Sequence, residues 1–178
     1  MGILDKLRGV KRPDDSVSAV SRAELEQRLF ALNHEQIPFT VTTSDLNAPS
    51  DFQTEWRIVD ANWYEIFAKA GLVKTHKIYL GIDEEEREVG ALEEAWEIEW
   101  QVGVPNMRLS MEKQHGRTFG SASFGRGYAF KGVNPLSFGE FYDYRFNVSE
   151  MKDPIVVTIT AAGWTYVPVM TKGKLRRG

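Results

Sequence analysis

The sequence predicts an α+β protein: a predominantly antiparallel β-sheet or barrel with an N-terminal helix and one or two further short helices. Apolar and polar residues alternate in many short runs between residues 37 and 170, which is the period of a half-buried strand. The connections between these runs are short and polar, which favours meanders over parallel crossovers. A helical period is found in only a few segments. Together these observations place most of the chain in strands.

The clearest helix signal in the sequence begins at Ser21. Ser21 is a good N-cap, and Glu24 completes a Ser-x-x-Glu capping box. Leu25 and Leu29 then share one apolar face, and Asn33 can end the helix. We therefore expect an amphipathic helix that starts directly after Ser21.

Two further segments favour a helix. Residues 61–70 carry apolar side chains at helical spacing between an aspartate and a glycine. The segment 154–162 is ambiguous, because its β-branched residues suit a strand. Asp153 as the cap, Pro154 at the first helical position and Gly163 after the last turn instead describe a short helix. These end signals favour the helix.

The alternating runs predict seven to nine strands. In EAWEIEWQV at 94–102, Trp96, Ile98 and Trp100 alternate with Glu97 and Glu99. We expect the apolar side chains to be buried and the glutamates to face water, because burying an unpaired carboxylate is very costly. The predicted strand segments are 38–43, 54–59, 75–82, 87–92, 95–102, 106–112, 117–130, 138–146 and 164–170.

The 178 residues favour one domain with terminal extensions. Residues 1–20 are predicted to be a basic amphipathic segment and linker. Residues 21–171 are predicted to be a single β-rich domain that includes its leading helix. Residues 172–178 form a basic tail.

The composition excludes several classes of protein. The chain has no cysteine, so a disulfide scaffold, a thiolate zinc site and a cysteine nucleophile are excluded. No apolar run approaches the ~20 residues of a membrane span. The N-terminus lacks the apolar core of a signal peptide. We expect a cytoplasmic protein, with peripheral contact to a membrane as an option.

The charges are distributed unevenly along the chain. Residues 1–12 carry four bases and one acid, and residues 172–178 carry four bases and no acid. The remaining residues carry 14 bases and 24 acids, a net charge of −10. Such a body repels phosphates, so no nucleic acid is expected as a partner. The basic ends suit an anionic surface.

No catalytic motif survives inspection. The segment SASFG at 121–125 is one residue short of a nucleophile elbow, and an aromatic, glycine-rich strand follows it where a helix is required. Glycines 120, 125 and 127 do not fit a phosphate-binding loop. The three histidines have no ligand spacing. We expect no metal and no cofactor, identify no catalytic residue, and favour a protein that is not an enzyme.

Two resemblances add expectations to this interpretation. The segments WYEIFAKAG, KIYL, EVGALEEAWEIEW, YAF, YRF and GWTYVPV are similar to those of a group of small uncharacterised bacterial proteins, many of which start with a segment similar to MGILDKL. This resemblance covers nearly the whole chain and implies a bacterial source. The order of short strands, a late apolar segment and a final strand also resembles the tubby-like class, which includes the scramblase and LURP-one relatives. It implies a barrel around a C-terminal helix and a lipid- or membrane-associated binding module, although no fingerprint motif matches.

Two functional hypotheses follow. The first is a non-enzymatic module that binds a protein partner or an anionic membrane surface. Its candidate contacts are Ile3, Leu4, Lys6, Leu7, Lys11, Arg12, Lys174, Arg176 and Arg177. The alternative is a small-ligand-binding protein or enzyme with a pocket inside a β-barrel, and its candidate lining residues are Trp96, Trp100, Tyr142 and Tyr144. A strand edge can also pair two copies into a homo-oligomer.

Overall fold

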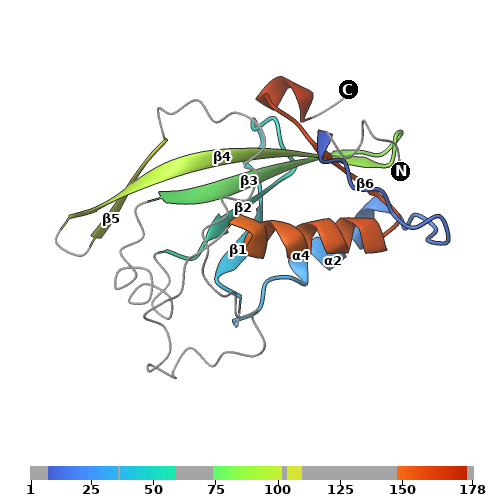
Figure 1. The fold of residues 1–178 in the computed structure, drawn as a ribbon, viewed down its shortest axis with the longest axis horizontal. Coiled ribbons are helices and arrows are strands. Elements are labelled where there is room, and N and C mark those ends of the chain that lie inside the picture. The colour runs from blue at the N-terminus through green and yellow to red at the C-terminus, as the bar shows by residue number, and fades with distance from the viewer. Residues whose placement is uncertain (1–7, 36, 59–73, 102–103, 110–147, 176–178) are drawn as a thin grey trace.

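The structure is a computed structural model that describes residues 8–35, 37–58, 74–101, 104–109 and 148–175. Figure 1 shows the arrangement of its helices and strands. In chain order they are α2 (Arg22–Phe30), β1 (Phe39–Thr43), β2 (Phe52–Trp56), β3 (Lys74–Asp83), β4 (Glu88–Gln101), β5 (Val104–Leu109), α4 (Val148–Ala161), β6 (Thr165–Pro168) and the short 3-10 helix η2 (Lys172–Lys174). The predicted helix at 61–70 and the predicted strands at 117–130 and 138–146 lie outside the described residues.

The described strands form one sheet in the order β1-β2-β3-β4-β5, and each pair of neighbours is antiparallel. Strand β6 pairs with the first part of β4 and is parallel to it. A mixed α+β class with a mostly antiparallel sheet is therefore confirmed. The barrel is not shown, because the sheet formed by the described strands is open.

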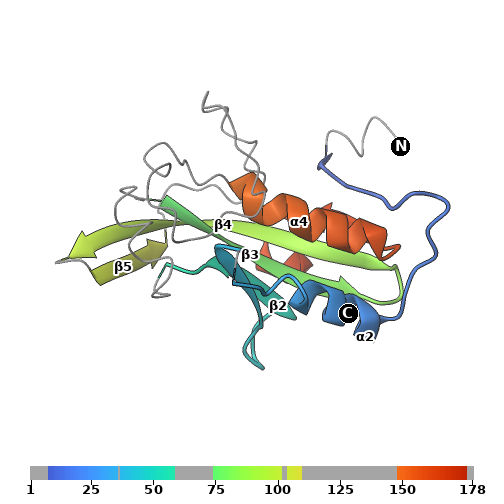
Figure 2. The ribbon, with the colours of Figure 1, turned by 90° about the horizontal axis from the view of Figure 1, so that it is seen from below.

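The sheet lies between two unequal layers. Helices α2 and α4 cover one face, which we call the inner face, and η2 lies against the opposite or outer face (Figure 1). Figure 2 shows the two helices side by side. The core lies between the helices and the inner face. Its buried side chains include Leu25, Leu29, Ile78, Leu80, Ile155 and Ile159. Each contributes roughly 1.5–3 kcal/mol by burial.

Helix α2 begins as predicted. The Glu24 backbone N–H donates to the Ser21 hydroxyl at 3.3 Å, and the Glu24 carboxylate pairs with Arg28. The helix ends at Phe30 and not at Asn33, so the predicted end was wrong. Asn33 lies beyond the helix, where its side chain bonds the backbone of Val41 in β1.

Helix α4 confirms the helical interpretation of 154–162 but corrects its start. The helix begins at Val148, so Pro154 is inside it and Asp153 is not its cap. Val148 and Met151 are buried and extend the apolar face of the helix, which outweighs the hydrogen bond lost at Pro154. The helix ends as predicted, because Gly163 has a positive φ of 78°. The backbone N–H groups of Gly163 and Trp164 donate to the carbonyls of Thr160 and Ile159, which is the Schellman motif.

The strand predictions need two corrections. Strand β2 begins at Phe52, before the predicted segment 54–59, and ends at Trp56. Residues 87–92 and 95–102 were expected to be two strands, but β4 runs without interruption over Glu88–Gln101. No glycine or proline separates the two runs, and all of β3 pairs with β4 in one register. Ile98 is buried and Glu97 and Glu99 are exposed, as expected. No helix in the described parts of the chain is long and apolar enough to cross a membrane.

Candidate functional site

Two adjacent glutamates in β4 lie on opposite faces of the sheet. Glu93 and Glu94 are only 5% and 4% exposed. Successive residues of a strand point to opposite faces, so Glu93 faces the helices and Glu94 faces η2. Each carboxylate forms an ion pair with a lysine, Lys152 of α4 on the inner face and Lys172 of η2 on the outer face. The two pairs differ in the exposure of their lysine side chains, which is 21% for Lys152 and 54% for Lys172.

The inner pair is enclosed by the core. The Lys152 ammonium group bonds Oε1 of Glu93 and lies 6.0 Å from the centre of the Tyr166 ring. Tyr166 is completely buried, and this burial, followed by the charges of Glu93 and Asp153, raises the pKa of its hydroxyl far above the ordinary value. The tyrosine therefore stays protonated, and the Lys152 side chain is only 21% exposed. The ion pair therefore holds α4 against β4.

The outer pair is part of a group of charges and aromatic rings. The Lys172 ammonium group is 3.0 Å from Oε1 of Glu94 and 5.2 Å from the centre of the Tyr79 ring. Lys77 lies 4.9 Å from the centre of the Trp96 ring and pairs with Glu55 at 2.6 Å, which brings it to the same face. Burial and the nearby charge of Glu94 raise the pKa of Tyr79, so this hydroxyl also stays protonated.

Three buried polar atoms in the part of the outer face around Glu94 make no hydrogen bond within the described chain. They are the Thr75 hydroxyl, Oε2 of Glu94 and the indole N–H of Trp96. The Thr42 hydroxyl, farther along the outer face, and Oε2 of Glu93 and the Tyr166 hydroxyl of the inner pair also lack a partner. Thr75 and Trp96 are directly opposite in the register of β3 and β4, so they share a face. An unsatisfied buried polar atom costs about 1–3 kcal/mol, and such atoms are uncommon in native proteins. We call Thr75, Tyr79, Glu94 and Trp96 the outer site.

The chain after β6 places Lys172 over the outer site. Leu175 is 2% exposed and packs against Leu92. Its backbone lies against Gly81 and Gly90, which are partners across β3 and β4. A Cβ at Gly81 would be 2.1 Å from the Leu175 carbonyl oxygen, so only glycine allows this approach. The glycine pair is therefore part of what positions the ammonium group.

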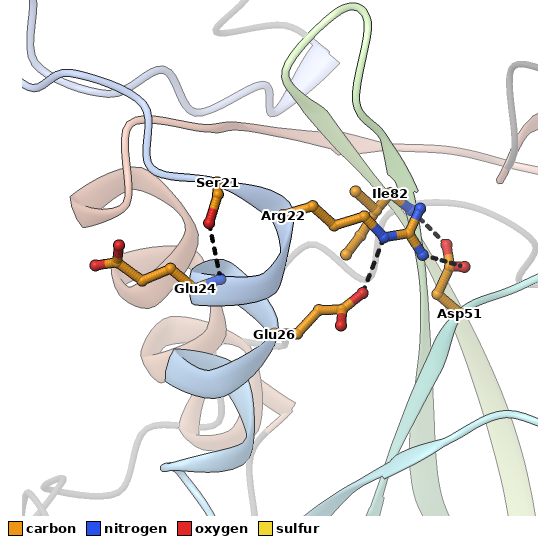
Figure 3. Close-up of polar contacts among 6 residues, drawn as sticks. All are labelled: Ser21, Arg22, Glu24, Glu26, Asp51 and Ile82. Atoms are coloured by element: carbon orange, nitrogen blue, oxygen red, sulfur yellow. Dashed lines mark hydrogen bonds and ion pairs between the residues drawn. The ribbon is translucent and has the colours of Figure 1, made fainter.

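A second polar contact fixes β3 to helix α2 (Figure 3). One carboxylate oxygen of Asp51 accepts from the Arg22 guanidinium at 3.0 Å, and the other accepts from the Ile82 backbone N–H at 2.7 Å. Arg22 also bonds Glu26 in the next turn of the helix at 2.9 Å. Both oxygens of Asp51 are satisfied, so this group has a structural role in holding the strand that carries Thr75 and Tyr79.

The structure places the predicted pocket residues as follows. Trp96 is half-buried in the outer site, and Trp100 belongs to the same strand. Tyr142 and Tyr144 lie outside the described residues, so the pocket that these four residues were expected to line stays a prediction.

Among the predicted contacts of the basic ends, three are described. Lys11, Arg12 and Lys174 are exposed. Ile3, Leu4, Lys6, Leu7, Arg176 and Arg177 lie outside the described residues. The parts of the chain that the structure describes contain no group of three acids or histidines that could hold a metal ion.

Sequence reasoning missed Thr75, Tyr79, Glu94 and Lys172. The available signal was the pair Glu93–Glu94 inside a strand, because adjacent charges in a period-two pattern must put one charge on each face. The Gly81–Gly90 pair gives a second signal of a close backbone approach. Neither signal reveals Lys172, which arrives from a distant part of the chain.

Comparison of the chain with protein-family models, with curated proteins and with solved structures finds no match.

Proposed function

We propose that this protein is a non-enzymatic binding module, and that the outer site receives a polar group of its ligand. The observation that carries the proposal is the presence of three unsatisfied polar atoms, on Thr75, Glu94 and Trp96, beside two aromatic rings. These atoms are shielded from solvent in the free protein, so a ligand reaches them only when a covering side chain such as Lys172 moves aside. Bonding them then removes a cost that the free protein bears.

The chemistry of the three atoms supports binding over catalysis. The indole N–H only donates, the carboxylate oxygen only accepts, and the hydroxyl does both. The raised pKa of Tyr79 keeps its hydroxyl protonated, so it is a poor base or nucleophile. Glu94 is held in an ion pair with Lys172. The site therefore suits a ligand that carries both a donor and an acceptor.

The test is a nuclear magnetic resonance titration that follows the indole N–H signals of the tryptophans. The probes are acetamide, methylguanidinium, n-butylammonium and acetate, each added separately to the full chain. We expect at least one probe to shift the Trp96 signal. The Trp164 signal is an internal control, because this buried indole already donates to the Val20 carbonyl at 3.0 Å.

A variant localises the effect. Thr75→Val keeps the shape of the side chain and removes the hydroxyl, so the shifting probe should bind about five- to tenfold more weakly. The proposal fails if no probe shifts the Trp96 signal more than the Trp164 signal.

A second candidate, binding to an anionic membrane surface, is favoured by the position of β6. The N–H and C=O of Lys11 bond the C=O and N–H of Tyr166 at 2.9 and 2.8 Å. Strand β6 thus holds the N-terminal basic segment and leads directly into the C-terminal one, which contains the exposed Lys174. Electrostatic attraction supplies about 1 kcal/mol per base near such a surface.

Liposome sedimentation tests this candidate. Vesicles that contain phosphatidylserine should retain the protein, and Lys11→Gln/Lys174→Gln should weaken retention about thirtyfold. Equal recovery with anionic and neutral vesicles would remove it.

A further inference from the structure

We infer that the outer site binds the ammonium group of a lysine side chain from a protein partner, and that Lys172 occupies this position in the free protein. The inference rests on the proposed function, because it names the ligand of the same site. Lys172 is then an internal competitor that the lysine of the partner displaces.

The geometry around Lys172 is that of an ammonium site. Its Nζ is 3.0 Å from Glu94 Oε1 and 5.2 Å from the centre of the Tyr79 ring, so a carboxylate and an aromatic face act on one cation. Lys77 makes the equivalent contacts with Glu55 and Trp96 beside it. The outer face is therefore built to hold ammonium groups, and an anionic ligand would meet two carboxylates there.

The contact of Lys172 is the replaceable one. Its side chain is 54% exposed, whereas that of Lys77 is 16% exposed. Helix η2 has only three residues, and its first residue is preceded by Thr171, whose side chain makes no capping bond. No atom lies within 4 Å of a Cβ built at Gly173. The segment is thus free of close packing at Gly173, directly after Lys172.

The anchors of the segment lie on either side of Lys172. Val169 and Leu175 are buried, and both pack against Leu92 or its neighbours in the small outer cluster. Lys172 can therefore leave Glu94 while the segment stays attached. This exchange opens a route from solvent to the unsatisfied oxygen of Glu94.

The remaining groups select a lysine within a polypeptide over a free cation. Tyr79 packs against the small outer cluster around Leu92, so the apolar stem of a lysine side chain can lie over this surface, which a small free cation would leave uncovered. Oε2 of Glu94 accepts a second N–H from the same ammonium group, which carries three donors. A lysine side chain thus matches the charge of Glu94 and the apolar surface beside it.

The experiment compares two small probes on the full chain. The first is Nα-acetyl-lysine-methylamide, and the second is Nα-acetyl-norleucine-methylamide, which has the same apolar stem without the ammonium group. Each is titrated into the wild type, Lys172→Met and Lys174→Met, with the Trp96 indole signal as the readout. Lys174 is exposed on the same segment, so its variant is the matched control.

We expect Lys172→Met to bind the lysine probe about fivefold more tightly than the wild type, because the internal competitor is gone. Lys174→Met should bind like the wild type. Lys172→Met/Glu94→Gln should lose the gain, and the norleucine probe should not bind any of them. The unchanged Trp164 signal verifies that each variant is folded.

Equal affinity of wild type and Lys172→Met for the lysine probe would overturn the inference, as would equal binding of the norleucine probe. The acetamide probe separates a failure of lysine binding from a failure of the proposed function. If acetamide still shifts the Trp96 signal in that case, the outer site binds neutral groups and only the lysine inference fails. If no probe shifts it, the proposed function fails as well.

Discussion

Glu93 and Glu94 are both nearly out of contact with water, yet their lysine partners are exposed to different degrees. Removing a carboxylate from water costs several kcal/mol unless a close ammonium group compensates it. Lys152 is held between sheet and helix, whereas Lys172 reaches in from the surface. The inner pair is therefore part of the framework of the fold, and the outer pair can exchange its cation.

The inner pair predicts a large loss of stability when one partner is removed. Lys152→Met leaves the Glu93 charge buried and unpaired, so the free energy of unfolding should fall by about 3–5 kcal/mol. The double variant Lys152→Met/Glu93→Leu removes both charges and should recover most of that loss. Urea denaturation measures both, with the exposed Lys174→Met as the control. An equal loss in the single and double variants would contradict the ion-pair explanation.

The raised pKa values of Tyr79 and Tyr166 predict that the folded protein loses stability at alkaline pH. A free tyrosine ionises near pH 10, and the pKa values of Tyr79 and Tyr166 are raised in the folded protein. Between these values the folded state keeps protons that the unfolded state releases, so unfolding releases protons. The contribution is fully present below about pH 10 and is lost as the pH rises above it.

Urea midpoints and phenolate absorbance, measured together across this pH range, check the alkaline prediction. Tyr166→Phe should make the stability less dependent on pH than in the wild type. If all six tyrosines of the chain ionise near pH 10 while the protein stays folded, the prediction is wrong.

Strand β1 lies at one edge of the sheet that the described strands form, and a side chain closes this edge. Asn33 donates to the Val41 carbonyl and accepts from the Val41 N–H, both at 2.7 Å. Its carboxamide therefore makes the two bonds that a residue of a neighbouring strand would make. An unprotected edge strand is a template for pairing with another chain.

Asn33→Ala should expose this edge. The loss of two hydrogen bonds should lower the free energy of unfolding by about 1–3 kcal/mol, and the freed groups should promote association between copies. Asn33→Asp keeps the acceptor but turns a carboxylate oxygen toward the Val41 carbonyl oxygen, so it should lower the free energy of unfolding at least as much as Asn33→Ala. Denaturation and sedimentation velocity at several protein concentrations give the answer. Identical midpoints and sedimentation for Asn33→Ala and the wild type would refute this role.

The ends of the helices also show why some features can be predicted from the sequence and others cannot. Ser21 and Gly163 act through the backbone next to them, so their roles are visible in a few residues. The start of α4 is set by burial of Val148 and Met151 against distant residues, and this outweighs the local signal of Pro154. The outer site depends on Lys172, whose contact with Glu94 requires the whole sheet to be in place.

Strand β4 connects three other strands of the molecule. It pairs with β3 along one edge and with both β6 and β5 along the other. The segment after β6 then crosses to the outer face, where Leu175 docks on the glycine pair. The end of the described chain thus depends on the geometry of the central hairpin.

Gly81→Ala tests this dependence. The new methyl group overlaps the Leu175 carbonyl, so the segment should be expelled with a loss of about 2–5 kcal/mol, similar to the loss of a buried leucine. Gly173→Ala is the matched control, because no atom lies within 4 Å of its Cβ position. In a thermodynamic cycle, Leu175→Ala should cost little once Gly81→Ala is present. Additive losses would show that the two positions are independent.

The glycine pair also bears on how the β3–β4 hairpin avoids misalignment during folding. A shift by one residue would set Val89 or Ala91 opposite Gly81, and the side chains of a strand exchange faces with each such slip. The misaligned hairpin would present a methyl group where the main chain of Leu175 must lie. Only the native alignment leaves space for Leu175. Docking of this residue therefore stabilises correctly paired hairpins and does not stabilise slipped ones.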